Sequence, residues 1–369
     1  MLFRSISAGT IAVTTNDGLG TNGSGTTIGA SGTLDIQGVN YSTTEGLTVN
    51  GGTIKTSTGT STFAGAISLG ATSTVDVGGT QLTLSGIISG TSFGITKTSS
   101  GILILSGTNT YTGVTTINAG TLSVATIGNG GVAGNLGQAT NTASNLVLGG
   151  GTLQYTGSTA STDRAFTITN STTGTFDVST SGTDLTISGA SASTSGALTK
   201  VGSGRLILSG ANAYTGLTTI SAGALQAANN TALGTTASGT TVADGAALEL
   251  SGSITIGAEA LTLNGSGISS GGALRNVSGS NTYQGAITQA SASRINSDSG
   301  TLTLDVASGN GITGTYNLTF GGSGNITVND PIATSSGTLT KDGSGTLTLS
   351  GTNTYTGSTT IKDRKSTRL

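Results

Sequence analysis

The 369-residue chain contains no cysteine, no histidine and no tryptophan, and it has one proline and one methionine. Without cysteine there is no disulfide, no thiolate zinc site and no thiol nucleophile. Without histidine there is no Ser-His-Asp triad and no imidazole ligand for a metal or haem. The chemistry left to the chain is that of carboxylate, lysine, arginine, tyrosine and hydroxyl groups.

Charged and aromatic residues are also scarce, at 8% and 4%, and the net charge is -2. A globular protein usually has about a quarter of its residues charged, whereas a disordered chain usually combines high net charge with low hydrophobicity. Here apolar residues alternate with polar ones, as at Leu302, Leu304 and Val306, which is typical of half-buried strands. Glycine interrupts each candidate helix and costs about 1 kcal/mol in a helix interior. The chain is predicted to be all-β.

One phrase occurs three times: ITKTSSGILILSGTNTYTGVTTINAGTL from Ile95, LTKVGSGRLILSGANAYTGLTTISAGAL from Leu198 and LTKDGSGTLTLSGTNTYTGSTTI from Leu339. Short strands broken by glycine continue along the whole chain, and no composition shift marks a boundary. A sandwich ends by about 250 residues, whereas a parallel β-helix continues because each coil pairs with the previous one at about 4.8 Å. We therefore predict a single elongated parallel β-helix over residues 1–361, with full repeats at 95–124, 198–227 and 339–361.

The core of the repeat, GxLxLSGxNxYxGxTTIxxGTL, stands at 101–122 and 204–225 and is truncated at 345–361. It resembles the passenger-associated strand repeat of bacterial autotransporters. The segments TDRAFTITNSTTGTFDV from Thr162 and GGALRNVSGSNTYQGAIT from Gly271 are similar to that family as well. The resemblance implies a right-handed parallel β-helix outside the outer membrane, secreted or surface-displayed. It also implies a signal peptide before the β-helix and a membrane β-barrel translocator after it.

Neither flanking segment is recognised in the sequence. The first residues, MLFRSISAGTIAVTT, lack the apolar core of a signal peptide, and no run reaches the 18 or more apolar residues of a membrane helix. The chain is expected not to span a membrane itself and to be anchored through the absent barrel. The last eight residues, 362–369, hold four of the 13 basic residues. We expect a non-native or mis-assembled tail there; a basic patch for phosphate or lipid is the alternative.

Some β-helix enzymes cleave polysaccharides with Asp, Lys and Arg alone, so charged neighbours were considered as catalytic groups. A lysine opens each full repeat, and a catalytic residue is seldom needed three times. The repeat therefore favours a structural role, as a surface charge before a turn, for Lys97, Lys200 and Lys341. The groups considered were Asp163 with Arg164, Lys200 with Arg205, and Lys341 with Asp342.

Sugar hydrolysis requires two carboxylates at about 5 to 10 Å, and the sequence selects no such pair. Isolated acids such as Asp76 and Asp305 are interpreted as solvated outward positions that discourage wrong strand pairing. The calcium-binding Gly-Gly-x-Gly-x-Asp repeat is absent, and no Lys-Ser/Thr follows the glycines at 149–151. No catalytic, cofactor-binding or metal-binding residue is predicted. The acids considered were Asp35, Asp76, Asp177, Asp184, Glu249 and Asp305.

The repeat also carries an asparagine and, two residues later, a tyrosine. Asparagine tolerates left-handed backbone, so these asparagines are expected at corners of the coil. In an extended segment the tyrosine shares the asparagine's face and is expected to lay its ring over a coil. An aromatic row that stacks on sugars is the alternative. The pairs are Asn109 with Tyr111, Asn212 with Tyr214, Asn281 with Tyr283, and Asn353 with Tyr355.

Outward threonine and serine would present a hydroxyl surface that suits glycans, matrix proteins or other cell surfaces and has no affinity for nucleic acid. A regular threonine array, as ice binding requires, is not expected because TTI and GTL recur irregularly. Open coil ends favour self-association. We therefore predict a non-catalytic structural or adhesive stalk without a cofactor. The alternatives are a polysaccharide-active β-helix enzyme and a spacer that presents another domain.

Overall fold

A computed structural model describes residues 4–20 and 25–362. The predicted tail, 362–369, lies outside the described residues except for Lys362. Apart from two short 3-10 turns, η1 (Ala143–Asn145) and η2 (Ile268–Ser270), the regular structure is β-strand. The chain divides into two compact units. Unit 1 comprises Met1–Ser179 with Ile187–Ala192, and unit 2 comprises Thr180–Thr186 with Ser193–Leu369.

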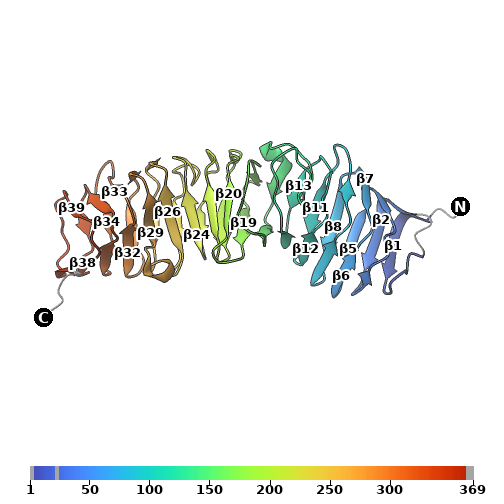
Figure 1. The fold of residues 1–369 in the computed structure, drawn as a ribbon, viewed down its shortest axis with the longest axis horizontal. Coiled ribbons are helices and arrows are strands. Elements are labelled where there is room, and N and C mark those ends of the chain that lie inside the picture. The colour runs from blue at the N-terminus through green and yellow to red at the C-terminus, as the bar shows by residue number, and fades with distance from the viewer. Residues whose placement is uncertain (1–3, 21–24, 363–369) are drawn as a thin grey trace. The chain divides into compact units, whose positions relative to one another are not determined.

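In unit 1, short strands stack into two parallel sheets (Figure 1). The strands are β1 (Arg4–Val13), β2 (Thr26–Ile36), β3 (Asn40–Tyr41), β4 (Leu47–Asn50), β5 (Thr53–Thr56), β6 (Thr60–Phe63), β7 (Ile67–Ala71), β8 (Ser73–Val77), β9 (Gln81–Leu84), β10 (Ile88–Ser89), β11 (Ile95–Thr98), β12 (Ile102–Leu105), β13 (Thr115–Ile117), β14 (Thr121–Val124), β15 (Leu146–Leu148), β16 (Thr152–Tyr155), β17 (Ala160–Thr162), β18 (Thr167–Ile168) and β19 (Thr173–Val178). One sheet runs β10-β7-β4-β2-β5-β8-β11-β13-β15-β18, with β1 also on β2, and the other runs β3-β6-β9-β12-β14-β16-β19; β17 belongs to neither of these two sheets.

Unit 2 stacks its strands into three parallel sheets. All but the last residue of β20 (Asp184–Ile187) belongs to it. The other strands are β21 (Ala197–Val201), β22 (Arg205–Leu208), β23 (Thr218–Ile220), β24 (Ala224–Ala227), β25 (Thr240–Val242), β26 (Ala247–Ser251), β27 (Thr255–Ile256), β28 (Leu261–Leu263), β29 (Leu274–Ser278), β30 (Asn281–Tyr283), β31 (Ile287–Gln289), β32 (Ser293–Ser297), β33 (Thr301–Leu304), β34 (Ile312–Thr313), β35 (Leu318–Gly321), β36 (Asn325–Val328), β37 (Ile332–Ala333), β38 (Leu339–Lys341), β39 (Leu347–Leu349) and β40 (Thr359–Ile361). The three orders are β21-β23-β25-β28-β31-β34-β37, β20-β22-β24-β26-β29-β32-β35-β38-β40 and β27-β30-β33-β36-β39.

Most strands bury alternate residues, as the sequence pattern predicts; β24 and β26 are buried throughout. In β12, Leu103 and Leu105 are buried, while Ile102 and Ile104 are half-buried. The register then aligns inward side chains of successive coils into continuous apolar columns. One such column is Leu82, Leu103, Leu122, Leu153 and Phe176. The prediction of an all-β, parallel β-solenoid is confirmed.

The first two repeat lysines are buried, so the expectation of a surface charge is wrong for them. Lys97 and Lys200 are each 0% exposed. The Lys97 Nζ donates to the carbonyls of Thr98 and Ser99 at 2.7 Å, and to that of Ala119 in the next coil at 3.2 Å. Lys200 repeats the pattern with Val201, Gly202 and Ala222. Each ammonium group thus ties a turn to the following coil, which is a structural role.

Burial lowers the pKa of Lys97 to about 8 because the ammonium group loses water, although Asp76 opposes this shift. The carbonyls reach the lysine because the chain turns sharply two residues later. That residue has a left-handed backbone in all three repeats, at Ser99 (φ 61°), Gly202 (φ 77°) and Gly343 (φ 70°). The left-handed turn therefore presents the carbonyl groups that bind the lysine ammonium group.

The backbone of the repeat asparagines is not left-handed, so the expectation that these residues adopt this conformation at corners of the coil is wrong. None of the four has a positive φ. Instead, the side-chain amide supplies a hydrogen bond between coils. The Asn109 Oδ1 accepts from the Ile88 N–H at 2.8 Å, and its Nδ2 donates to the Asn135 carbonyl at 2.9 Å. Asn281 and Asn353 accept in the same way from the N–H groups of Ile254 and Ile332.

The repeat tyrosines are buried, as predicted. Tyr111, Tyr214 and Tyr283 are each 0% exposed, so they cannot stack on sugars. The hydroxyl groups of Tyr111 and Tyr214 hydrogen-bond Thr115 and Thr218 at 2.7 and 2.8 Å. The half-buried Tyr355 has an equivalent hydrogen bond to Thr359 at 2.9 Å.

A glycine in the next coil makes room for two of these rings. A Cβ atom at Gly137 would lie 2.6 Å from Cε2 of Tyr111, and one at Gly234 would lie 2.9 Å from the Tyr214 ring. Both glycines also have left-handed backbone, with φ of 73° and 86°. Residues with a side chain would therefore be doubly disfavoured there.

Candidate functional site

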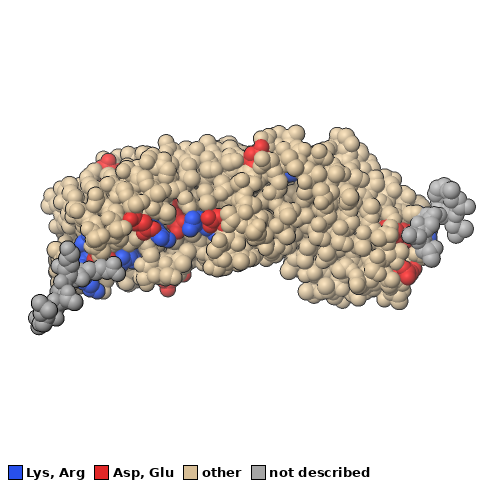
Figure 2. All heavy atoms as spheres, in the orientation of Figure 1, with Lys and Arg blue, Asp and Glu red and all other residues tan. Residues whose placement is uncertain are grey.

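Ion pairs follow one another along one sheet of unit 2 (Figure 2). Arg205 pairs with Asp184 at 3.6 Å and, through Nε, with Glu249 at 3.1 Å. Arg275 pairs with Glu249 at 3.2 Å and with Asp298 at 2.6 Å. We call this set, together with Arg294 and Asp342, the charged stripe.

The strand register produces this stripe. Gln226 lies opposite Glu249, Glu249 opposite Arg275, and Arg275 opposite Asn296, in four successive strands from β24 to β32. Coils are about 4.8 Å apart, so long side chains at these positions reach the coils above and below. Arg205 stands two residues away from this column, opposite Ala224, and its long side chain reaches Gln226 diagonally, with Nη1 3.3 Å from Oε1.

Glu249 is the central acid of the stripe and is 1% exposed. Burial raises its pKa above the ordinary value, and the guanidinium groups of Arg205 and Arg275 oppose that shift. Both carboxylate oxygens face arginine nitrogens, at 3.1 and 3.2 Å. A carboxylate held in this way orders two cations and is not presented as a free base or nucleophile.

The stripe ends in a bidentate pair. The two terminal nitrogens of Arg294 each lie 2.7 Å from an oxygen of Asp342, and Nη2 also donates to Asn296 at 3.0 Å. These residues are two coils apart, and the coil between them carries Gly321. A Cβ atom at Gly321 would overlap both Arg294 and Asp342. The hydrogen bonds from Arg294 lower the pKa of Asp342, which keeps that carboxylate ionised.

Two hollows lie along the stripe. One, of about 160 Å³, is lined by Asp184, Arg205, Glu249 and Arg275 among others. A larger one, of about 610 Å³, lies at the bidentate pair. Oriented carboxylate, amide and guanidinium groups are suited to hydrogen-bond the hydroxyl groups of a ligand. The larger hollow is lined by Arg294, Asn296, Asp298, Asp342 and Lys362, with turn residues around them.

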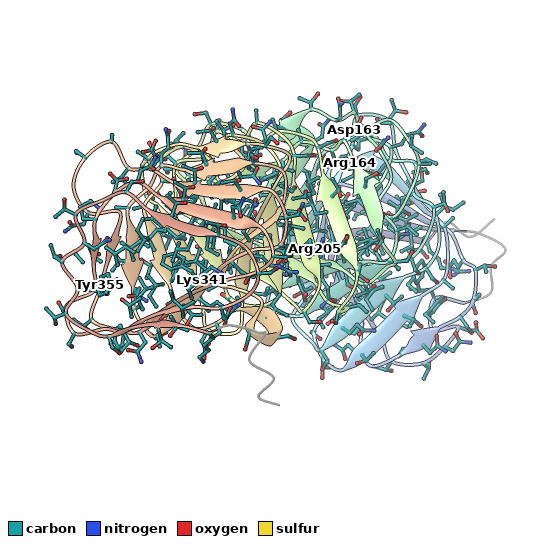
Figure 3. All side chains as sticks on the ribbon, turned by 60° about the vertical axis from the view of Figure 1, so that its left-hand side comes forward. Asp163, Arg164, Arg205, Lys341 and Tyr355 are labelled. Carbon is teal, nitrogen blue, oxygen red and sulfur yellow. The ribbon has the colours of Figure 1, made fainter. Side chains whose placement is uncertain are left out.

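The stripe includes four residues that the sequence analysis named: Asp184, Arg205, Glu249 and Asp342. Lys341 lies beside the stripe, but its Nζ donates to the carbonyls of Asp342 and Gly343. The lysine therefore stabilises the turn that follows it. Lys200 is buried in a turn and forms no site with Arg205. Arg205 and Lys341 are labelled in Figure 3.

Asp163 and Arg164 are adjacent in unit 1 but have separate partners (Figure 3). Arg164 is 3% exposed, and its guanidinium donates to the carbonyls of Gly128 at 2.9 Å and Gly137 at 2.8 Å. It also donates to Ala139 and Val132. The carboxylate of Asp163 accepts from the Gly130 N–H at 2.7 Å. Both residues hold the loop between β14 and η1, which is a structural role.

The remaining acids are held locally. Asp76 is half-buried and pairs with Lys55 at 3.4 Å, while Asp305 accepts from Asn329 at 3.1 Å. Asp35 and Asp177 accept from nearby glutamines at 2.8 Å. Asp184 and Glu249 are the two considered acids that come together, through Arg205.

Threonines form regular outward columns in unit 2, although their spacing in the sequence is irregular. The turns absorb the length differences, so the strands keep one register. This corrects the expectation of an irregular threonine surface. One column is Thr199, Thr219, Thr241, Thr262, Thr288 and Thr313. The second is Thr255, Thr282, Thr303, Thr327 and Thr348.

Two further observations limit the chemistry of the described residues. Within 4–20 and 25–362, no three acids are grouped so that they could hold a metal ion. In the same residues, no helix is long and apolar enough to cross a membrane.

Comparison with known proteins agrees with this architecture. The family model of the Passenger-associated-transport-repeat matches residues 95–124, 198–227 and 339–363. The chain is also similar to the adhesin BmaC autotransporter of Brucella suis biovar 1 (strain 1330), with 43% identity over 146 residues. That alignment covers 39% of this chain and 4% of the adhesin. No solved structure matched.

The structure is a solenoid of parallel coils that carries three passenger-associated transport repeats. Its aligned 146-residue segment is similar to part of an autotransporter adhesin. The same findings support a location outside the cell or at the bacterial cell surface.

Proposed function

We propose that the chain is a non-catalytic, structural and adhesive stalk that binds hydroxyl-rich ligands, glycans or glycosylated matrix, through the charged stripe of unit 2. The observation that carries the proposal is the stripe itself, in which charge is concentrated on a solenoid that otherwise presents neutral threonine columns. The aligned adhesin is far longer than this chain, so its name supports the proposal for the matched region and does not define the whole protein.

The stripe is better suited to binding than to catalysis. Its acids are engaged by arginine, and a general acid or base needs a proton-transfer group that is free to reach the substrate. Arginine keeps spare N–H donors after pairing with a carboxylate, and sugar hydroxyl groups can accept from them. Side chains already held in place lose little freedom when a ligand binds, which favours affinity.

A glycan and matrix-protein binding array with the full chain tests this proposal. A stripe variant, Arg275→Gln with Arg294→Gln, is compared with Lys55→Gln, which breaks the half-buried Lys55–Asp76 pair of unit 1. We expect saturable binding by the wild type, at least about a tenfold loss for the stripe variant and no loss for the control. The same glycans are assayed for cleavage.

Equal binding by the stripe variant and the wild type would place the adhesive surface elsewhere. Turnover that is lost in Glu249→Gln would favour the polysaccharide-active enzyme. A folded chain that neither binds nor cleaves any ligand would favour a spacer. Far-ultraviolet circular dichroism establishes that each variant is folded before binding is compared.

A further inference from the structure

A second short motif, Glu-x-Leu-Thr-(Val/Leu)-Asn, occurs at 45–50 in unit 1 and at 259–264 in unit 2. In both copies the glutamate is buried, with Glu45 0% and Glu259 2% exposed. In both, Oε1 accepts from a threonine that opens a strand of the preceding coil. Thr26 donates at 2.6 Å in the first copy and Thr240 at 3.0 Å in the second. The two units thus build the same acidic position.

In unit 1 this position is fully compensated. Glu45 receives the Arg4 Nη1 at 2.9 Å and the Tyr41 hydroxyl at 3.1 Å, in addition to Thr26. A buried carboxylate is stable in a protein when it is paired and hydrogen-bonded. The guanidinium group of Arg4 therefore completes the site.

In unit 2 the compensating charge is missing. Among the described residues, no cationic nitrogen lies within 4.0 Å of the Glu259 carboxylate. The register shows the reason. Arg4 aligns with Thr26, whereas Thr218 aligns with Thr240. Thr218 is uncharged and bonds the Tyr214 hydroxyl, so it does not neutralise the acid.

Glu259 lines a hollow of about 320 Å³. This volume lies at the lower end of the about 300–1,000 Å³ typical of ligand pockets. Its walls combine the apolar Leu233 and Ile256 with the polar Asn230 and Thr236. Asn230, Thr236 and their neighbour Thr231 are exposed, so the rim is open to solvent. A buried, uncompensated acid thus adjoins an accessible and partly apolar space.

We propose that this hollow binds the guanidinium group of an arginine carried by a partner polypeptide, with Glu259 in the role that Glu45 has toward Arg4. A guanidinium group is more weakly hydrated than an ammonium group and has apolar faces that can pack against Leu233 and Ile256. Its several donors can bond both the carboxylate and the rim amide. The inference goes beyond the proposed function because it concerns different residues from the charged stripe.

Binding of such a cation is expected to depend on pH. Burial raises the pKa of Glu259 to about 7. Tyr214 and Tyr283 are the titratable groups that act on this acid electrostatically, and burial raises the pKa of both above the ordinary value, so they stay neutral. The carboxylate is therefore ionised above about pH 7 and protonated below it. The cation should bind more tightly at pH 8 than at pH 5.5.

The test is calorimetric titration of the full chain with N-acetylarginine amide, N-acetyllysine amide and glucosamine. We expect saturable binding of the arginine compound at pH 8, weaker by at least about tenfold at pH 5.5 and in Glu259→Gln. The matched control is Asp305→Asn, which neutralises an acid outside the hollow and should bind as the wild type does. The lysine compound should bind more weakly.

A second variant, Thr236→Arg, places a guanidinium group on the rim. It should raise thermal stability at pH 8 and abolish binding of the arginine compound, even if Glu259→Gln folds poorly. Unchanged binding in Glu259→Gln, absence of saturable binding in the folded wild type, or tighter binding of lysine or glucosamine would each overturn the proposal. The adhesive proposal is tested by the stripe variant, so the two fail independently.

Discussion

The two copies of the buried glutamate show that one coil framework can hold the same charge in two electrostatic states. Glu45 in unit 1 has Arg4, Thr26 and Tyr41 as partners, whereas Glu259 in unit 2 has Thr240. The backbone ladders on either side are equally regular. The fold therefore does not require the charge to be balanced, because stacked strands supply enough hydrogen bonding and apolar burial to tolerate the cost at one position.

The buried tyrosines also differ in whether their polar group has a partner. Tyr111 and Tyr214 have a threonine four residues later that bonds the hydroxyl group. Tyr283 has Ile287 at that position, and its hydroxyl is buried without a hydrogen-bond partner. The full repeats complete their polar groups, and the degenerate copy leaves one incomplete.

The largest expected effect concerns a buried charge of unit 1 that has a complete set of partners. Arg164→Met would remove one donor from each of the carbonyls of Gly128, Gly137 and Ala139, although Gly128 and Ala139 each keep a second donor. Because several hydrogen bonds to a charged group are lost, we expect a loss of about 3–5 kcal/mol in the free energy of unfolding of unit 1. Urea denaturation measures this loss, and hydrogen exchange of 128–139 reports the loop.

The matched control is Arg205→Met in the charged stripe. The Arg205 side chain is 35% exposed, its pair with the partly exposed Asp184 contributes about 0–1 kcal/mol, and the buried Glu249 keeps Arg275 as a partner. If both variants lost the same stability, burial of Arg164 would not be what distinguishes the two arginines.

The next largest effect is the change in stability when each buried glutamate is replaced by glutamine, and it should have opposite signs at the two positions. Glu45→Gln leaves Arg4 without its counter-charge and should destabilise the chain by about 2 kcal/mol. Glu259→Gln removes an uncompensated charge and should stabilise the chain by about 2–3 kcal/mol at pH 8.

The sign of the pH effect follows from the raised pKa of Glu259, about 7 against 4.5. Between these values the folded chain keeps a proton that the unfolded chain releases, so stability falls as pH rises through this window. Above about pH 7 the whole loss is present. Melting temperatures from pH 4 to 8 should therefore show this fall in the wild type and not in Glu259→Gln. Parallel curves would contradict the burial of an uncompensated acid.

Much of this fold follows from the sequence because the repeat and the alternation are local signals. The alternation of buried and outward residues also predicts which way the repeat lysines point. In Leu198-Thr199-Lys200 the lysine has the same parity as the buried leucine, so it points inward. The recurrence of the lysine before a turn in each repeat favours a surface charge instead, and an inward lysine is rare in proteins. Carbonyl groups from two coils make it acceptable here, and that environment exists only once the coils are stacked.

The charged stripe could not be predicted in this way. Its partners come from different coils, and Arg294 and Asp342 are 48 residues apart in the sequence. Turn lengths vary from coil to coil, so the register that aligns Glu249 with Arg275 is not visible in the sequence. The threonine columns were missed for the same reason. Whether a residue points outward follows from the local alternation. Which residues lie above and below it depends on the lengths of the intervening turns.

The smallest expected effect is the change in stability when a buried tyrosine hydroxyl is removed. It should differ between a full repeat, which contains Tyr214, and the degenerate copy, which contains Tyr283. Tyr283→Phe removes a hydroxyl that is buried without a partner, so it should stabilise the chain by about 1 kcal/mol. Tyr214→Phe removes the hydrogen bond to Thr218 and should destabilise it by about the same amount. Urea denaturation at fixed pH compares the two. Loss of stability in both variants would mean that the Tyr283 hydroxyl has a hydrogen-bond partner in solution; Glu259 is an acid that acts on it electrostatically.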